Sequence, residues 1–157
     1  MRYYDDIIGL FVSNYALDYP VEFNGLGCVN VESGVVSETS QPTDEPWLRV
    51  TVNGGSTIHA SIGTVATKLK REPFDFAVEI FIPRTTMTSS TRYTPYTSVA
   101  IEEHLDGFLL VDGWRVADGG TIYTEQSEPK FKSTPQPSAE DTWQRVLITY
   151  QYVYQYI

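Results

Sequence analysis

Three residues have side chains that commonly act as metal ligands or nucleophiles, namely His59, His104 and Cys28. The two histidines lie far apart in the sequence, and neither has a cysteine, a histidine or a carboxylate at the spacing of a metal site. Cys28 is the single cysteine, and no catalytic motif surrounds it. We therefore expect structural or surface roles for all three side chains.

Two glycine-containing stretches and one cluster of acids are the remaining candidates for chemistry. The stretches "GLG" at 25–27 and "NGG" at 53–55 are typical of turns, because neither has the lysine or the third glycine of a phosphate-binding loop. The acids of "EEHLD", which are Glu102, Glu103 and Asp106, are expected to point to water from the polar side of an amphipathic helix. The sequence thus predicts no catalytic residue, no metal site and no cofactor, and a protein that is not an enzyme.

Length and composition are typical of one soluble globular domain covering residues 1–157. The chain has 41% hydrophobic and 20% charged residues and a formal net charge of -9. Such a charge argues against general affinity for DNA or for anionic membranes, because phosphate binding requires clustered Lys and Arg. The first residues have no small-residue cleavage site after an apolar stretch, so we interpret them as a mature N-terminus. The single cysteine is compatible with a reducing compartment.

The charges are unevenly distributed along the chain. The first 45 residues contain eight acids and one basic residue, Arg2. Residues 46–71 contain no acid and four basic residues, Arg49, Lys68, Lys70 and Arg71. Such polarity favours a molecule that presents opposite signs to a neighbour. A solvated surface whose charges are segregated without function is the alternative.

Hydrophobic spacing predicts two helices. In residues 4–15 the apolar side chains recur with helical period, and Asp5 and Asp6 lie in the first turn, where acids are favourable. The second helix begins near Thr94, a capping residue, and Pro95, which suits the first helical position. Its expected buried stripe consists of Ile101, Leu105, Phe108 and Leu109.

Alternating apolar residues predict the strands. We expect strands at 47–52 and 57–62, joined as a hairpin by "NGG", then at 75–82, 113–117, 121–125 and 143–157. The expected loops are 27–45, with one short strand around 28–31, then 84–93 and 126–141. This order predicts an α+β fold, a mostly antiparallel sheet with two helices on one face.

The final strand has an unusual tyrosine-rich face. Val146, Ile148, Tyr150, Tyr152, Tyr154 and Tyr156 alternate along it and therefore point the same way. Its tyrosine half is typical of an interface, since tyrosine offers contact area and a hydroxyl at low entropic cost. We expect removal of residues 152–157 to damage assembly. An ordinary sheet strand is the alternative interpretation.

Several segments together resemble a known family. They are "YPVEFNG", "PWLRVTV", "HASIG", "FAVEIFIP", "SVAIEEHLDGFL" and "DTWQRVLITYQYVY". In this order the chain resembles the tail-terminator proteins of long-tailed bacteriophages, also called tail-completion or minor tail proteins. The segment 27–45 is longer than this pattern expects.

The resemblance implies a structural virion protein, assembled in the host cytoplasm, that forms a homohexameric ring. The ring sits on the head-proximal end of the tail tube, stops tube polymerisation and offers a surface to a neck or head-completion protein. DNA passes through without specific binding, no membrane is involved, and no cofactor is needed. On this basis we expect interface residues at Lys68, Lys70, Arg71, Arg84, Arg92, Tyr152, Tyr154 and Tyr156, and channel-facing acids at Glu102, Glu103 and Asp106.

Two alternatives stay open. One is a small α+β dimer resembling the nuclear-transport-factor-2-like fold, which would bind or convert an apolar ligand in a pocket between strand faces. The sequence has no obvious Asp/His pair for such a pocket. The other is a different head–tail connector, a neck or head-completion protein.

Overall fold

The computed structural model describes residues 4–32, 35–39, 41–42, 45–54, 58–59, 69–83, 95–111, 114–116, 119–124, 126–137 and 143–157. Its strands are β1 (Val21–Phe23), β2 (Cys28–Glu32), β3 (Val35–Thr39), β4 (Trp47–Gly54), β5 (Ile58–His59), β6 (Lys70–Pro83), β7 (Trp114–Arg115), β8 (Thr121–Tyr123), β9 (Phe131–Lys132), β10 (Gln136–Pro137) and β11 (Trp143–Tyr156). They form one sheet in the order β3-β2-β1-β4-β6-β11-β8-β7, in which β5 pairs with β6, and β9 and β10 pair with β11. The α+β class expected from the sequence is confirmed.

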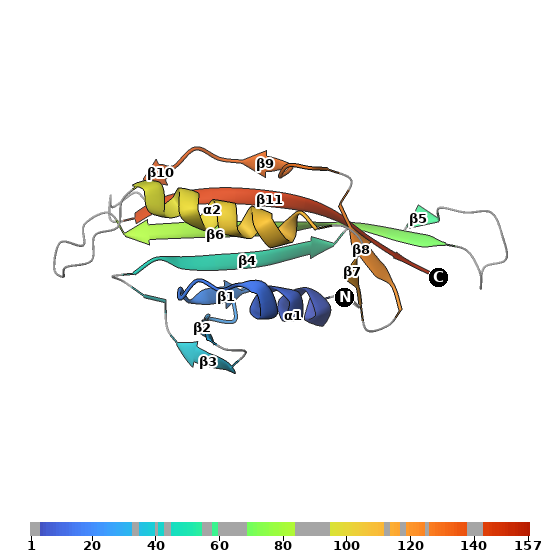
Figure 1. The fold of residues 1–157 in the computed structure, drawn as a ribbon, viewed down its shortest axis with the longest axis horizontal. Helices are drawn as coiled ribbons and strands as arrows, with labels where there is room; N and C mark the ends of the chain where they lie inside the picture. The colour runs from blue at the N-terminus through green and yellow to red at the C-terminus, as the bar shows by residue number, and fades with distance from the viewer. Residues whose placement is uncertain are drawn as a thin grey trace.

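The helices are α1 (Tyr4–Asn14) and α2 (Pro95–Leu109), as the periodicity predicts. Both lie on the same face of the sheet, with α2 over β6 and β11 and α1 beside β1 (Figure 1). The ring of Phe11 joins the two layers, because its centroid lies 6.0 Å from that of Phe76 on β6 and 5.6 Å from that of Phe108 on α2. Neither helix has the length and apolar character that crossing a lipid bilayer requires within the described ranges.

The longest strands, β6 and β11, form the centre of the sheet. Each has 14 residues, and they pair antiparallel along their whole length, from Trp143 opposite Pro83 to Tyr156 opposite Lys70. Strand β4 pairs antiparallel with the other side of β6, and β1 pairs parallel with β4. Alternation along these strands directs one set of side chains towards the helices, where burial of apolar area stabilises the fold. Fully buried members of this set are Phe76, Val78, Ile80, Ile148, Tyr150 and Tyr154.

Two expectations for the chain before β6 are wrong. The segment 27–45 is not mainly a loop, because β2 and β3 pair as an antiparallel hairpin over five residue pairs. In the described residues 47–54 and 58–59, the arms of the expected hairpin at "NGG" do not pair with each other either, since β4 and β5 both pair with β6. Strand β6 has 14 residues, so each arm of the expected hairpin can pair with a strand that is longer than the other arm. Pairing with β6 therefore overrides the local turn signal.

The expected loop 126–141 contains two short strands, β9 and β10, that pair with β11. The backbone N–H of Ser133 also donates to the carbonyl of Leu147, and the Leu147 N–H donates to the Ser133 hydroxyl. This segment is therefore held along β11 rather than free of the sheet. The expected loop 84–93 lies outside the described residues.

Candidate functional site

The tyrosines expected to form a contact surface lie mostly inside the subunit. Tyr152 and Tyr154 are 2% and 0% exposed, and Tyr150 beside them is 1% exposed. The sequence correctly predicts that these side chains share one face of β11. The prediction that Tyr152 and Tyr154 form a contact surface is wrong, because both are buried. Helix α2 covers Tyr150 and Tyr152, and the turn between β7 and β8 packs against the ring of Tyr154, so these rings belong to the core.

Their hydroxyl groups find partners within the chain, as buried polar groups require. Tyr150 donates to the Asp106 carboxylate at 2.5 Å, and the Tyr152 hydroxyl donates to the carbonyl oxygen of Leu109. Tyr156, which is half-buried, donates to Glu72 at 2.9 Å. Burial raises the pKa of Tyr150 and of Tyr152 well above the usual value for tyrosine.

The expected basic interface residues are only partly described. The ammonium of Lys70 lies 5.7 Å from the ring centroid of Tyr156, and the guanidinium of Arg71 lies at the same distance from Tyr123. Both are thus cation–π partners within the chain. Lys68, Arg84 and Arg92 lie outside the described residues.

The three acids expected to face a channel differ in their surroundings. Glu102 is 7% exposed and forms an ion pair with Lys132 at 3.0 Å, so the expectation that it points to water is wrong. Asp106 is half-buried and accepts the hydrogen bond of Tyr150. Glu103 is exposed, as expected.

The sheet face opposite the helices carries a row of alternating charges. Arg49 contacts Glu22 at 3.1 Å and Glu79 at 3.9 Å, and Glu79 contacts Arg145 at 2.5 Å. The row crosses β1, β4, β6 and β11, which are consecutive in the sheet. Glu22, from the acidic first third of the sequence, and Arg49, from the basic segment 46–71, therefore neutralise each other within one chain. The charge distribution along the sequence instead predicts such pairs between copies.

An aromatic cluster lies beside this charged row. The rings of Trp47 and Phe81 stack at 4.1 Å, Trp143 meets Trp47 edge-on at 6.3 Å, and the Arg49 guanidinium lies 5.3 Å from the first two rings. Cross-strand aromatic pairs of this kind stabilise a sheet. We interpret the cluster as packing that fixes the ends of β4, β6 and β11.

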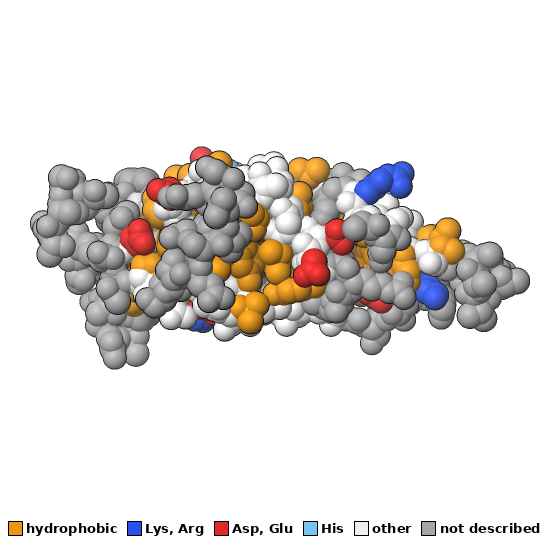
Figure 2. Space-filling model, turned by 90° about the horizontal axis from the view of Figure 1, so that it is seen from below, with side chains coloured by type: hydrophobic (Ala, Val, Ile, Leu, Met, Phe, Trp, Pro, Cys, Tyr) orange, Lys and Arg blue, Asp and Glu red, His pale blue; other side chains and the backbone are white. Residues whose placement is uncertain are grey.

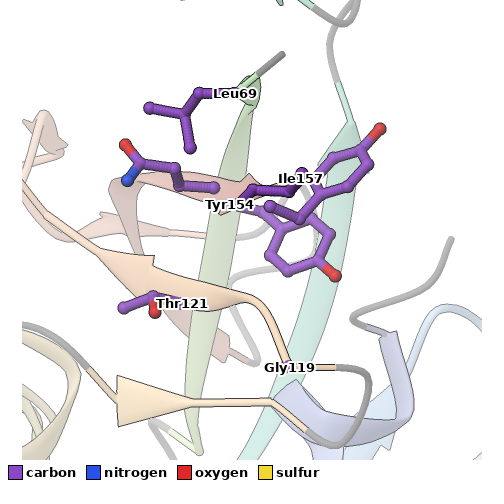
Figure 3. A pocket seen from close by; sticks show the side chains of 7 residues that line it. Leu69, Gly119, Thr121, Tyr154 and Ile157 are labelled. Atoms are coloured by element: carbon purple, nitrogen blue, oxygen red, sulfur yellow. The ribbon is translucent and has the colours of Figure 1, made fainter. Parts of the chain in front are cut away.

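A pocket of about 310 Å³ borders the far end of β11. It is lined by Leu69, Gly119, Thr121 and the residues from Tyr154 to Ile157 (Figure 3). The neighbouring Gly120 lies so close to Tyr154 that a Cβ atom there would be 2.1 Å from the tyrosine ring. The close contact between Gly120 and the Tyr154 ring therefore closes one side of the pocket.

The residues first considered for chemistry have structural surroundings where they are described. The Nε2 atom of His104 accepts a hydrogen bond from the Ala16 N–H at 3.1 Å, and its ring packs edge-on against Tyr15 and Phe108. Cys28 is buried, and burial raises the pKa of its thiol to about 11. The side chain of His59 lies outside the described set. No group of three metal-ligating side chains occurs in the described part of the chain.

Sequence reasoning missed two surface features. One is Leu26, which is 71% exposed on the turn between β1 and β2. The other is a groove of about 500 Å³ between α2 and residues 132–135. The "NGLG" stretch signals the turn, but the groove depends on the placement of α2 beside residues 132–135, which are distant from it in sequence.

The sequence matches no protein-family model, and no curated protein matches it either.

Proposed function

We propose that this chain is a structural subunit of a long-tailed bacteriophage, a tail terminator that forms a ring at the head-proximal end of the tail tube. The ring has six copies in the family that the chain resembles. It stops tube polymerisation and presents its other side to a neck or head-completion protein. Catalysis and a cofactor have no part in this role.

The observation that carries the proposal is that segments behind the resemblance are neighbours in one packed unit. "PWLRVTV" leads into and forms β4, "FAVEIFIP" lies in β6, and "DTWQRVLITYQYVY" supplies most of β11, three consecutive strands of the sheet. "SVAIEEHLDGFL" forms most of α2, which covers β6 and β11 (Figure 1). The resemblance thus concerns a coherent core and not scattered stretches, which supports a common architecture.

A ring of identical subunits needs two different contact patches on each subunit. With Tyr152 and Tyr154 buried and Arg49 paired within the chain, these residues are poor candidates for the patches. Glu103 is the exposed member of the acids proposed for the channel, and a carboxylate there would repel the phosphates of passing DNA.

The test is the native mass of the purified chain together with its effect on tube growth. The proposal expects rings of about six copies whose addition to polymerising tail-tube protein shortens the tubes, seen by electron microscopy. A stable dimer that binds a hydrophobic dye in a pocket, and leaves tube length unchanged, would contradict it and favour the ligand-binding alternative.

A further inference from the structure

The chain contains two Asn–Gly pairs, Asn24–Gly25 and Asn53–Gly54, each in a stretch that is typical of a turn. Such pairs are reactive sites for the loss of ammonia from an asparagine side chain, because glycine has no Cβ atom to hinder attack by its own backbone nitrogen. Both asparagines are exposed to solvent. Exposure therefore does not distinguish them, and the hydrogen bonds around each pair decide how readily it reacts.

The first pair is held firmly in the turn between β1 and β2. Asn24 has a positive φ angle of 46°, and the Leu26 N–H donates to the Phe23 carbonyl at 2.9 Å, as in a two-residue hairpin turn. The side-chain oxygen of Asn24 accepts a hydrogen bond from the Val52 N–H at 3.0 Å. The carboxamide of Asn24 is therefore fixed to β4.

The second pair lies at the end of β4, where the backbone nitrogen of Gly54 is outside the ladder. Backbone N–H and C=O groups alternate in direction along a strand. The Val50 carbonyl accepts from the N–H of Asn24, and the Val52 N–H points the same way, so the even-numbered residues of β4 face the β1 side. Gly54 has the same parity, but β1 pairs with β4 only as far as Val50. The Gly54 N–H therefore points away from β6 and past the end of β1.

The side chain of Asn53 is also less restrained than that of Asn24. Within the described residues, no hydrogen bond holds its carboxamide. Asn53 and Gly54 line a pocket of about 250 Å³ together with side chains that include Asp75, Lys130 and Gln151. A pocket of this size and polarity has room for water next to the carboxamide.

We propose that Asn53 is a site of spontaneous deamidation in the folded chain, whereas the fold protects Asn24. The Gly54 nitrogen loses its proton to hydroxide and attacks the side-chain carbonyl carbon of Asn53, which closes a five-membered succinimide ring. The bond from that carbon to the carboxamide nitrogen breaks, and the nitrogen takes a proton from water and leaves as ammonia. Water then opens the ring at either carbonyl and yields aspartate or isoaspartate. The inference does not depend on the proposed function.

The hydrogen bonds at the two sites set the difference in rate. Ring closure needs a rotation about the ψ angle of the asparagine, because neither an extended strand nor a left-handed turn places its side chain beside the next nitrogen. At Asn53 this rotation opens the end of the ladder with β6. At Asn24 it breaks both the turn bond of Leu26 and the side-chain bond from Val52. One additional hydrogen bond to break makes the reaction at Asn24 about tenfold slower.

Conversion of Asn53 changes the charge at this end of the sheet. The new carboxylate lies directly opposite Asp75, and like charges at facing positions destabilise a strand pair. Lys130, which contacts Asp75 at 3.1 Å, then has two carboxylates to neutralise. The chain already has a formal net charge of -9, and its surface seen from below has acids between hydrophobic side chains (Figure 2). Aged protein is therefore expected to contain a more acidic form with a lower urea midpoint.

The test follows both sites in the full folded chain during incubation at mildly alkaline pH. Trypsin releases residues 50–68, in which Asn53 is the single asparagine, and fragment ions of residues 3–49 locate Asn24. Mass spectrometry measures the replacement of the NH2 group by OH, and labelling by isoaspartyl methyltransferase detects isoaspartate. Conversion at Asn53 is expected to be about tenfold faster than at Asn24 and to rise with hydroxide concentration.

The same chain unfolded in guanidinium chloride is the matched control, because each asparagine then precedes a glycine without fixed structure, and the two rates are expected to be similar. Gly54→Ala adds a Cβ atom beside the attacking nitrogen and is expected to slow conversion of Asn53 while leaving Asn24 unchanged; circular dichroism checks its fold. Equal rates at the two sites of the folded chain, or faster conversion at Asn24, would overturn the inference. So would intact Asn53 in the folded chain after the unfolded chain has fully converted.

Discussion

At the scale of single residues, the tyrosines of β11 show that knowing which side chains share a face does not reveal whether that face is buried or exposed. Alternation along the strand fixes which side chains share a face, and the sequence therefore predicts correctly that Tyr150, Tyr152 and Tyr154 point the same way. Whether that face is a surface or a core depends on which elements cover it, and α2 is far from β11 in sequence. The hydroxyl groups are satisfied by Asp106 and Leu109, so polar atoms at these positions do not indicate an interface. Removal of residues 152–157 would therefore unfold the core and cannot test assembly.

The contact between Gly120 and Tyr154 gives the first stability prediction. A Cβ atom at position 120 would lie 2.1 Å from a ring that is fully buried and cannot move aside cheaply. Gly120→Ala is expected to lower the free energy of unfolding by about 1–3 kcal/mol, as overpacking does. Urea unfolding measures the change. Gly9→Ala is the control, because nothing lies within 4 Å of its Cβ in the helix α1, and it is expected to raise stability by about 0.5–1 kcal/mol. Equal stability of both variants would contradict the packing seen at Gly120.

At the scale of elements, the helices and the long strands were predictable and the strand partners were not. The bounds of α1, α2 and β11 and the end of β6 follow from periodicity and from Pro95 and Pro83, which are local signals, but β6 begins at Lys70, five residues before the expected strand at 75–82. The pairing of β1 with β4, and of β6 with β11, depends on contacts between residues distant in sequence. The acid-rich segment 27–45 also lacks an obvious period, although "NGLG" before it supplies a hairpin turn to β2.

The link between the two helices gives the second stability prediction. His104 on α2 accepts the Ala16 N–H just after α1 and packs against Tyr15. His104→Ala removes both contacts and is expected to cost about 1–2 kcal/mol. Hydrogen exchange is expected to rise most in the amides of α1, because that helix loses a tie to its neighbour. Glu103→Ala is the control on the same helix, with a change within about 0.5 kcal/mol expected for an exposed side chain. Unchanged exchange in α1 would show that the buried side chains of the helix, Ile7 and Phe11, secure it without this tie.

At the scale of the whole molecule, charge is distributed differently from what the sequence suggests. The division into an acidic first third and a basic segment 46–71 predicts complementary patches between copies. In the fold these stretches form adjacent strands, β1 and β4, and Glu22 meets Arg49 within the subunit. For this pair, charges that are far apart along the chain neutralise each other across neighbouring strands.

The buried tyrosines also set the response of the whole molecule to alkaline pH. Burial raises the pKa of Tyr15, Tyr150 and Tyr152 above the usual value near 10, so these groups keep their protons in the folded state where the unfolded chain loses them. The contribution of these three tyrosines to stability is therefore complete below about pH 10 and falls as the pH rises further, whereas that of the Cys28 thiol, whose pKa burial raises from 9.0 to about 11, begins to fall near pH 9. Each such group contributes about 1.4 kcal/mol per pH unit, so three give a slope of about 4 kcal/mol per pH unit.

Urea unfolding at several values between pH 9 and pH 11 measures this slope, and absorbance of the phenolate form follows ionisation. Ionisation of these tyrosines is expected to coincide with unfolding, because folded chains protect them. Tyr152→Phe removes one of these groups and is expected to reduce the slope by about 1.4 kcal/mol per pH unit, whatever it costs in stability at neutral pH. An unchanged slope in this variant, or phenolate absorbance of all tyrosines before unfolding, would show that the Tyr152 side chain is exposed to solvent in the folded chain. A tyrosine ladder at a subunit contact would titrate in the free subunit, so this measurement also separates a core strand from an assembly strand in β11.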